Sequence, residues 1–219
     1  MISNRNIDAS NTIPYDLAQA LGRDGINVII ETLWLAYHEL KRSCVFNRFT
    51  HENIITQEWG IYLTELWYQE NRASRIQIKI TPINQYENES SAESTRKAPQ
   101  IDFCFRSWDE PSYFGIECKN LYSKRPDKTR RYVEKGVNHF VSGYYASSST
   151  VSTMIGYVLS GSVEGAVRDL LPLIESLSAP IMNLTRDMLS QELQYKSRHL
   201  RTSDSKEILI YHLFFDFAA

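Results

Sequence analysis

Apolar residues recur at helical spacing in several stretches of the chain, and each stretch predicts an α-helix. In the N-terminal stretch Leu17, Leu21 and Val28 follow this spacing, and Gly22 and Gly25 allow a break between two helices. The sequence Thr-His-Glu-Asn at residues 50–53 is a favourable start for the next helix. The predicted helices cover residues 14–42, 52–70 and 130–146, the stretch from the Gly161-Ser162 cap to residue 177, and residues 182–195.

Other stretches alternate between apolar and polar residues or are apolar throughout, which is typical of β-strands. Ile76, Ile78 and Ile80 alternate in this way. The predicted strands cover residues 75–83, the two arms of a hairpin at 100–119, and residues 152–159 and 207–217, whereas the polar residues 84–100 predict a loop. This order of elements predicts an α/β fold in which a mixed central sheet is flanked by helices on both faces.

The hairpin carries the candidate chemistry. Because side chains alternate faces along a strand, Glu117 and Lys119 share one face of the downstream arm. On the upstream arm Asp102 faces away from Ile101 and Phe103. Pairing of the two arms would bring Asp102 beside Glu117, so that two carboxylates converge with one ammonium group. Such a set suits a divalent metal with a cation already built into the site.

An acidic residue, any residue and then lysine is a common tripeptide, and the chain has three copies. Glu39-Leu40-Lys41 lies in a helical pattern and Asp204-Ser205-Lys206 in a polar loop. Only Glu117-Cys118-Lys119 lies on an apolar strand that follows another strand with a lone aspartate. The alternative reading is a solvated sheet face whose ion pairs contribute about 0–1 kcal/mol. The apolar residues that flank the tripeptide disfavour that reading.

Asp102, Glu117 and Lys119, preceded by Pro99, resemble the signature of the PD-(D/E)XK nuclease superfamily. The chain departs from that signature because its proline lies three residues before the aspartate instead of one. The resemblance covers about residues 50–160 and implies a restriction-endonuclease-like core there. A single domain would then span residues 1–219, with an N-terminal helical extension at about 14–43 and a C-terminal helix and strand at about 180–217.

The resemblance also implies an activity, Mg²⁺-dependent hydrolysis of phosphodiester bonds, with Mn²⁺ as an alternative metal. Asp102, Glu117 and the main-chain carbonyl of Cys118 would hold the metal, and Lys119 would be catalytic. Oxygen ligands suit Mg²⁺ or Mn²⁺, and the chain shows no clustered histidines or cysteines that would favour zinc.

Many members of the superfamily carry a further glutamate on the helix before the first strand. Glu52 is the candidate, because it shares a helical stripe with Ile55 and Trp59 and would point toward the sheet. The alternative role of Glu52 is a favourable charge at the start of a helix. Glu58 lies off the apolar stripe and is the second candidate.

The segment from Lys119 to Lys135 is strongly basic, with seven cationic residues against two acidic ones. Local positive charge favours a phosphate backbone even where the whole chain has a net charge of −2. A solvated loop is the alternative reading, since charge runs usually are solvated. The candidate nucleic-acid-binding residues beyond the catalytic lysine are Lys124, Arg125, Lys128, Arg130, Arg131 and Lys135.

Composition indicates an ordinary soluble protein. Cys44, Cys104 and Cys118 form no Cys-x-x-Cys pair and are expected to be free thiols in a reducing compartment. The N-terminal residues are polar, without the apolar core of a signal peptide, and the most apolar run is too short to cross a bilayer. We therefore expect a cytoplasmic protein.

The partners are less sharply indicated. DNA is the expected substrate ahead of RNA, although the residues leave that choice open. No separate target-recognition segment is evident, which suggests a homodimer or a partner such as a helicase, as in bacterial defence systems of this superfamily. Two other classes remain open, a non-catalytic nucleic-acid-binding or scaffold module that keeps the fold, and a structural subunit with Trp67, Tyr68 and Tyr145 as its exposed interface.

Overall fold

A seven-stranded mixed β-sheet forms the centre of the computed structural model, which describes residues 25–74, 80–87, 100–107, 113–177, 180–188 and 190–218. The strands lie in the order β1-β2-β3-β4-β7-β6-β5. Their bounds are β1 (Ile80–Glu87), β2 (Gln100–Ser107), β3 (Tyr113–Tyr122), β4 (Val151–Ser160), β5 (Pro180–Arg186), β6 (Gln194–Leu200) and β7 (Glu207–Asp216).

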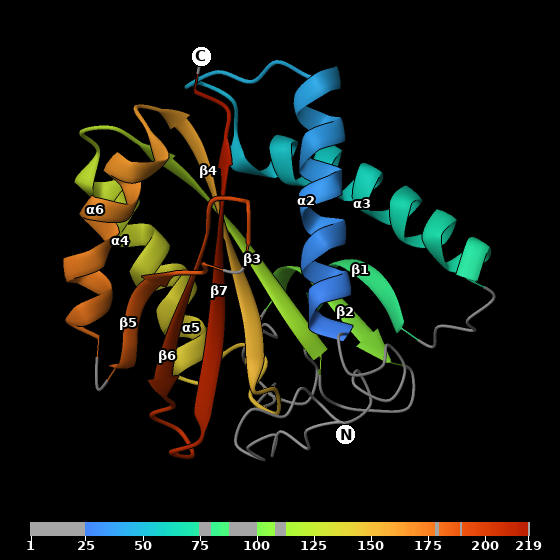
Figure 1. The fold of residues 1–219 in the computed structure, drawn as a ribbon. Helices are drawn as coiled ribbons and strands as arrows, with labels where there is room; N and C mark the ends of the chain where they lie inside the picture. Colours follow the sequence, from blue (N-terminus) through green and yellow to red (C-terminus); the bar gives the residue numbers. More distant parts are fainter. Residues whose placement is uncertain are drawn as a thin grey trace, which may run out of the picture.

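Helices cover both faces of this sheet, as Figure 1 shows. On one face lie α2 (Gly25–Ser43) and α3 (Glu52–Ser74). On the other lie α4 (Pro126–Tyr132), a π-helical turn (Val133–Val137), α5 (Asn138–Val141) and α6 (Val163–Glu175). The predicted α/β class, with a mixed sheet between two helical layers, is confirmed.

The sheet changes from antiparallel to parallel pairing at its centre. β1, β2 and β3 pair antiparallel, β3 pairs parallel with β4, and β4 pairs parallel with β7. β6 and β5 then extend the sheet in antiparallel fashion. The parallel strands β3 and β4 are covered on both faces, and each is buried along all but its last residue. A polar residue in the middle of β3 is therefore enclosed by the protein.

Two apolar cores lie on the two faces of the sheet. Trp59 of α3 and Trp34 of α2 contact Phe215 of β7 in the first core. In the second, Tyr132 of α4 stacks on Phe214 of the same strand. Each fully buried side chain of this size stabilises the fold by about 1.5–3 kcal/mol, so β7 is held by both helical layers.

Gly136 lets the π-helical turn pack closely against β3 and β4. A Cβ atom at Gly136 would overlap the Met154 side chain of β4 and lie 4.0 Å from Lys119 Cγ. The absence of a side chain therefore lets this turn approach the strands directly above Lys119.

Several predicted elements are confirmed. The helix expected at 52–70 is α3, the strand at 152–159 is β4, and the strand at 207–217 is β7. The Gly161-Ser162 cap is also confirmed, since Ser162 accepts a hydrogen bond from the Gly165 N–H at 3.1 Å at the start of α6.

Other boundaries differ from the prediction. Residues 84–87 belong to β1 and not to the polar loop, because they pair with β2 along the register from Asn84–Phe103 to Glu87–Gln100. The helix predicted at 130–146 begins at Pro126, a residue well suited to the first turn, and ends at Val141.

The helix predicted at 182–195 is wrong, because β5 and β6 occupy most of that segment. β6 pairs with β7 from Gln194–Leu213 to Leu200–Glu207. The backbone of the apolar strand β7 is therefore hydrogen-bonded to β6 along most of its length. Such tertiary pairing overrides weak helical spacing.

The predictions for residues 14–24, 75–79 and 88–99, and for the hairpin turn at 108–112, lie outside the described residues. Within the described residues, none of the helices has the length and apolar character needed to cross a membrane.

Candidate functional site

Glu117 and Lys119 lie side by side in the middle of β3, and each is only 5% exposed. The Lys119 Nζ atom lies 2.6 Å from Glu117 Oε1 and 2.7 Å from the main-chain oxygen of Cys118. The predicted shared face of these two side chains is therefore present, and the ammonium group is held by its own strand.

Asp102 joins this pair from β2. The β2–β3 register includes Phe103–Ile116, so the next position along places Asp102 opposite Glu117. Asp102 Oδ2 accepts a hydrogen bond from the Cys118 N–H at 2.8 Å and lies 3.9 Å from Lys119 Nζ. The hairpin thus brings the two carboxylates and the lysine together.

The alternation along β2 is less regular than the prediction. Ile101 was expected on the face of Phe103, but it packs in the opposite core. Gly115 on β3 leaves room for it, since a Cβ atom there would lie 2.7 Å from Ile101 Cδ1. The strand therefore departs from strict alternation next to Asp102.

Glu52, the first residue of α3, reaches the same group. Its Oε1 atom lies 3.3 Å from Lys119 Nζ, and its Oε2 atom accepts a hydrogen bond from the Asn120 N–H at 2.8 Å. Arg131 of α4 lies 4.0 Å from Glu52 Oε1. Glu58, the second candidate, makes no ion pair or hydrogen bond with this group among the described residues.

Asn120 is a positioning residue that the sequence reading missed. Its side-chain amide donates to the Thr50 main-chain oxygen at 3.0 Å and to the Tyr122 hydroxyl at 2.9 Å. Together with its N–H bond to Glu52, these contacts fix the start of α3 against β3. Its position directly after Lys119 on the strand is the signal that could have found it.

Burial shifts the ionisation of the carboxylates upward. Burial and the neighbouring Asp102 charge raise the pKa of Glu117 to about 8, although Lys119 opposes the shift. Burial likewise raises the pKa of Asp102. For Lys119, burial lowers the pKa, but the nearby carboxylates raise it more, so the ammonium form persists.

Three carboxylates around one ammonium leave an excess of negative charge in a poorly solvated place. The Oε2 atom of Glu117 is buried and has no hydrogen-bond partner among the described residues. An unpaired buried carboxylate oxygen is costly unless a cation or a proton meets it. The site therefore has the electrostatic character of a cation-binding site.

The donor set fits a hard divalent cation. Asp102, Glu117 and the Cys118 carbonyl offer only oxygen, the ligand that Mg²⁺ and Mn²⁺ prefer. No three His, Cys, Asp or Glu side chains in the part of the chain that the structure describes stand ready-arranged around a metal position. The Lys119 ammonium lies between the carboxylates in this arrangement, in contact with two of the candidate ligand atoms.

The basic segment is divided by the fold. Arg131 joins the site through Glu52, whereas Arg125 pairs with Asp127 and Arg130 lies 4.0 Å from Glu134.

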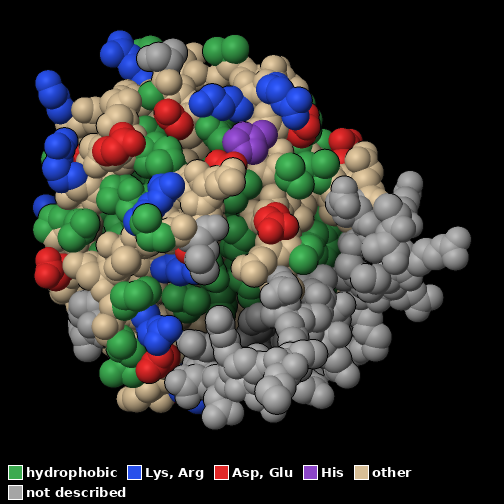
Figure 2. Space-filling view, viewed as in Figure 1, with side chains coloured by type: hydrophobic (Ala, Val, Ile, Leu, Met, Phe, Trp, Pro, Cys, Tyr) green, Lys and Arg blue, Asp and Glu red, His purple; other side chains and the backbone are tan. Residues whose placement is uncertain are grey.

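A separate hollow of about 380 Å³ is lined by Lys124, Arg125 and Arg130 together with Arg168 of α6. Figure 2 shows several Lys and Arg side chains at the margin of the molecule on this side. Lys128 is partly buried in α4, and Lys135 is exposed on the π-helical turn.

A cluster of three rings, His139, Tyr144 and Tyr145, lies near the carboxylates of Glu117 and Asp102. The rings of His139, Tyr144 and Tyr145 lie 4.8–5.2 Å apart, and Tyr144 is 47% exposed. Burial lowers the pKa of His139 to about 4, with the Lys135 and Lys119 charges adding to the shift. The His139 imidazole is therefore neutral at neutral pH.

The predicted exposed aromatic interface of Trp67, Tyr68 and Tyr145 is wrong for two of its three residues. Trp67 is 2% exposed and donates to the Ile80 main-chain oxygen, and Tyr145 is 6% exposed. Only Tyr68 of the three is exposed. Trp67 packs in the first core and Tyr145 in the second.

No protein-family model, curated protein or solved structure matches this chain. Its function therefore has to be inferred from the site itself.

Proposed function

We propose that this protein is a metal-dependent nuclease of the PD-(D/E)XK type, with a restriction-endonuclease-like core formed by α3, β1–β4 and α4. One observation carries the proposal, the convergence of Glu52, Asp102 and Glu117 on the buried ammonium of Lys119. The four residues come from one helix and two strands separated by up to 67 positions in the chain. Burying several charged groups together is unfavourable because they lose their hydration, and such clusters are typical of catalytic sites.

Asp102, Glu117 and the Cys118 carbonyl would hold the Mg²⁺ or Mn²⁺ ion. When bound, such an ion lowers the pKa of a coordinated water and offsets negative charge on a phosphate. The buried Glu117 Oε2 atom would be one of these ligand atoms, since it has no hydrogen-bond partner among the described residues. The carboxylates with raised pKa values lose their protons more readily when a cation is near.

Lys119 supplies the fixed positive charge of the site. Its pKa lies above the ordinary lysine value, so it keeps its proton at neutral pH. An ammonium group held by two acceptors on its own strand can donate to a phosphate oxygen or orient a water molecule without large reorganisation. Glu52 and Asn120 hold the end of α3 against this lysine.

The proposed substrate is nucleic acid, with DNA ahead of RNA. Arg131 lies at the site, and the cations around the α4–α6 hollow can contact phosphates further along a strand. A homodimer or a partner such as a helicase would supply targeting, and a role in bacterial defence fits such an arrangement.

The proposal is tested with the purified protein on plasmid, linear duplex, single-stranded DNA and RNA. Each substrate is incubated with Mg²⁺, with Mn²⁺ and with EDTA. We expect cleavage of at least one substrate with either metal and none with EDTA. Cleavage that persists in EDTA, or no cleavage of any of the four substrates, would contradict the proposal.

A thermal-shift measurement separates a nuclease from a non-catalytic module that keeps the fold. A ligand at 100 times its Kd stabilises the folded state by about 2.7 kcal/mol if it binds only that state. We expect Mg²⁺ to raise the Tm of the wild type but not of Asp102→Asn, whose amide oxygen can still accept from the Cys118 N–H. An equal rise in Tm in both proteins would show that Asp102 is not a ligand of the metal.

A further inference from the structure

A polar hollow of about 290 Å³ opens beside Asp102, between the first turns of α3 and strand β1. Its lining consists of Asn53, Thr56, Gln57, Asn84, Gln85 and Asp102. Four of these six residues carry primary amides.

The four amide groups have no hydrogen-bond partner among the described residues, whereas the other polar groups of the hollow are engaged. Thr56 donates to the Glu52 main-chain oxygen and contacts the Tyr157 hydroxyl at 3.1 Å. The Asp102 carboxylate accepts from Cys118. Unengaged donors and acceptors thus gather at one opening next to a proposed metal ligand.

The backbone of β1 is irregular at this place. Gln85 has a φ of 51°, in the left-handed region that residues other than glycine seldom adopt. The β1–β2 register runs through Asn84–Phe103 and Tyr86–Ile101, so Gln85 falls at the position across from Asp102. The strand therefore turns the Gln85 residue out of the regular ladder at the edge of the hollow.

The chemistry of the lining selects the class of ligand. A primary amide offers two donors and an acceptor, and Asn or Gln can bind an adenine edge through two hydrogen bonds. Among the described residues, the lining contains no Lys or Arg, so it does not suit a phosphate. Because the surface is hollowed and not ridged, it would accept a single base that has left its stack more readily than the edge of an intact duplex.

We propose that this amide hollow binds an unpaired base, preferably adenine, of the strand whose phosphate lies at Asp102. The inference rests on the proposed nuclease function and names its substrate class, a nucleic acid with an unpaired nucleotide at the cut. Single strands, flaps and frayed ends would be favoured over intact duplex.

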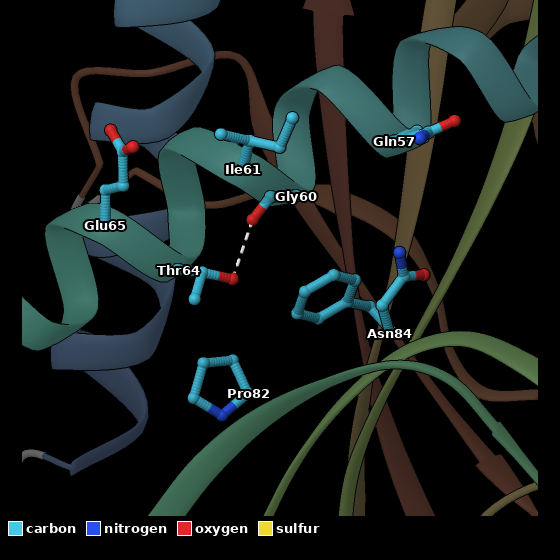
Figure 3. Close-up of a pocket in the computed structure, with 8 residues that line it drawn as sticks. Gln57, Gly60, Ile61, Thr64, Glu65, Pro82 and Asn84 are labelled. Carbon is cyan, nitrogen blue, oxygen red and sulfur yellow. Dashed lines mark hydrogen bonds between the residues drawn. The ribbon is translucent and has the colours of Figure 1, made fainter.

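The hollow continues into a larger groove that can hold the neighbouring nucleotide. Gln57 and Asn84 border both, and Figure 3 shows them at one end of this groove of about 440 Å³. Ile61 and Pro82 provide apolar walls beyond them. Apolar surface beside a base-binding hollow is suited to stacking of the next base, which tolerates any sequence.

The test measures binding without cleavage, with fluorescein-labelled oligo(dA), oligo(dT) and oligo(dC) single strands in EDTA. The proteins are the wild type, the double variant Gln57→Ala/Asn84→Ala, and the control Gln69→Ala, an exposed amide further along α3. We expect oligo(dA) to bind most tightly to the wild type. We expect the double variant to lose about tenfold affinity for oligo(dA), with little loss for oligo(dT), and the control to match the wild type.

Equal affinity of the double variant and the wild type for oligo(dA), or no binding of any strand by the wild type, would overturn the inference. Circular dichroism of the double variant confirms that the exposed substitutions leave the fold intact. Cleavage by the same proteins separates the two proposals. If the double variant binds oligo(dA) more weakly than the wild type does and no protein shows metal-dependent cleavage, base binding by the hollow is supported and the nuclease function is rejected. If the double variant cuts and binds as the wild type does, base binding by the hollow is rejected and the nuclease function is retained.

Discussion

At the scale of single residues, the candidate site depends on which glutamate of α3 reaches the strands. Glu52 contacts Lys119 and the Asn120 N–H, while Glu58 contacts neither. Both residues lie in the same helix and both are partly exposed, so they form a matched pair for substitution.

We expect Glu52→Gln to lower metal-dependent cleavage about 10–100-fold, the range found when residues that orient metal ligands are replaced. Glutamine keeps the size of the side chain and can still accept from Asn120, so the loss would come from the missing charge. Glu58→Gln should stay within about twofold of the wild type. The rates are compared on one substrate at one Mg²⁺ concentration, and equal losses in both variants would exclude the special role of Glu52.

Much of the site at this scale could be predicted from two periodicities. The alternation of side chains along a strand predicts that Glu117 and Lys119 share one face. The repeat of the α-helix predicts that Glu52 points toward the sheet. The amides of the hollow could not be found in this way, because Gln57 and Asn84 meet only when α3 packs across β1. Burial of Tyr145 was also beyond reach, since it depends on the packing of the loop after α5.

At the scale of elements, the position of β3 depends on how closely the π-helical turn packs over it. Gly136 permits that approach, because a side chain there would overlap Met154. Gly165 in α6 offers a contrast. A Cβ atom there would lie 3.4 Å from Ser162 Oγ, an ordinary contact.

We expect Gly136→Ala to destabilise the protein by about 1–3 kcal/mol, the usual cost of overpacking a core. It should also reduce cleavage, since the displaced turn lies over Lys119. Gly165→Ala should be neutral or stabilise by up to about 1 kcal/mol, because alanine favours a helix more than glycine does. Urea unfolding midpoints test both, and a Gly136→Ala midpoint at or above that of the wild type would contradict this account of the packing.

The elements that were predicted wrongly share a physical cause. The segment at 182–195 has some helical spacing, but β7 requires a partner along its length and β6 supplies it. Residues 84–87 are polar, yet backbone pairing with β2 needs no apolar side chains. Patterns along the chain report local preference, whereas an exposed strand edge selects its partner from elsewhere in the sequence.

At the scale of the whole molecule, a chain of buried polar side chains links helix α4 to strands β7 and β6 of the central sheet. Tyr132 of α4 contacts His212 of β7 at 3.0 Å, and His212 contacts Ser197 of β6 at 2.8 Å. Ser197 in turn contacts His199 at 2.8 Å. Burial lowers the pKa of His212 to about 3 and that of His199 to about 4.

These shifts make stability depend on pH in a defined direction. Both pKa values are lower in the folded state than the ordinary value of 6.5, so the unfolded chain binds more protons. The contribution of these two histidines to stability is therefore complete above about pH 6.5 and is lost as the pH falls toward 4. Well below pH 6.5 each histidine contributes a slope of about 1.4 kcal/mol per pH unit.

We expect the free energy of unfolding of the wild type to fall between pH 6.5 and pH 5. His212→Gln should show a shallower slope in the same interval, whatever its absolute stability, because it has lost one titrating group. Urea unfolding at half-unit steps of pH gives both slopes. Parallel slopes in the two proteins would show that His212 is not the group that titrates.

The central claim is that Lys119 and its carboxylates form a nuclease site, and one comparison tests it most directly. Metal-dependent cleavage is measured for the wild type, Lys119→Met and Lys41→Met, with the last variant taken from the acid-x-lysine tripeptide of α2. Methionine keeps most of the length of the lysine side chain and removes its charge. The account predicts full cleavage by the wild type and Lys41→Met and none detectable by folded Lys119→Met. Cleavage by Lys119→Met at the wild-type rate would contradict it.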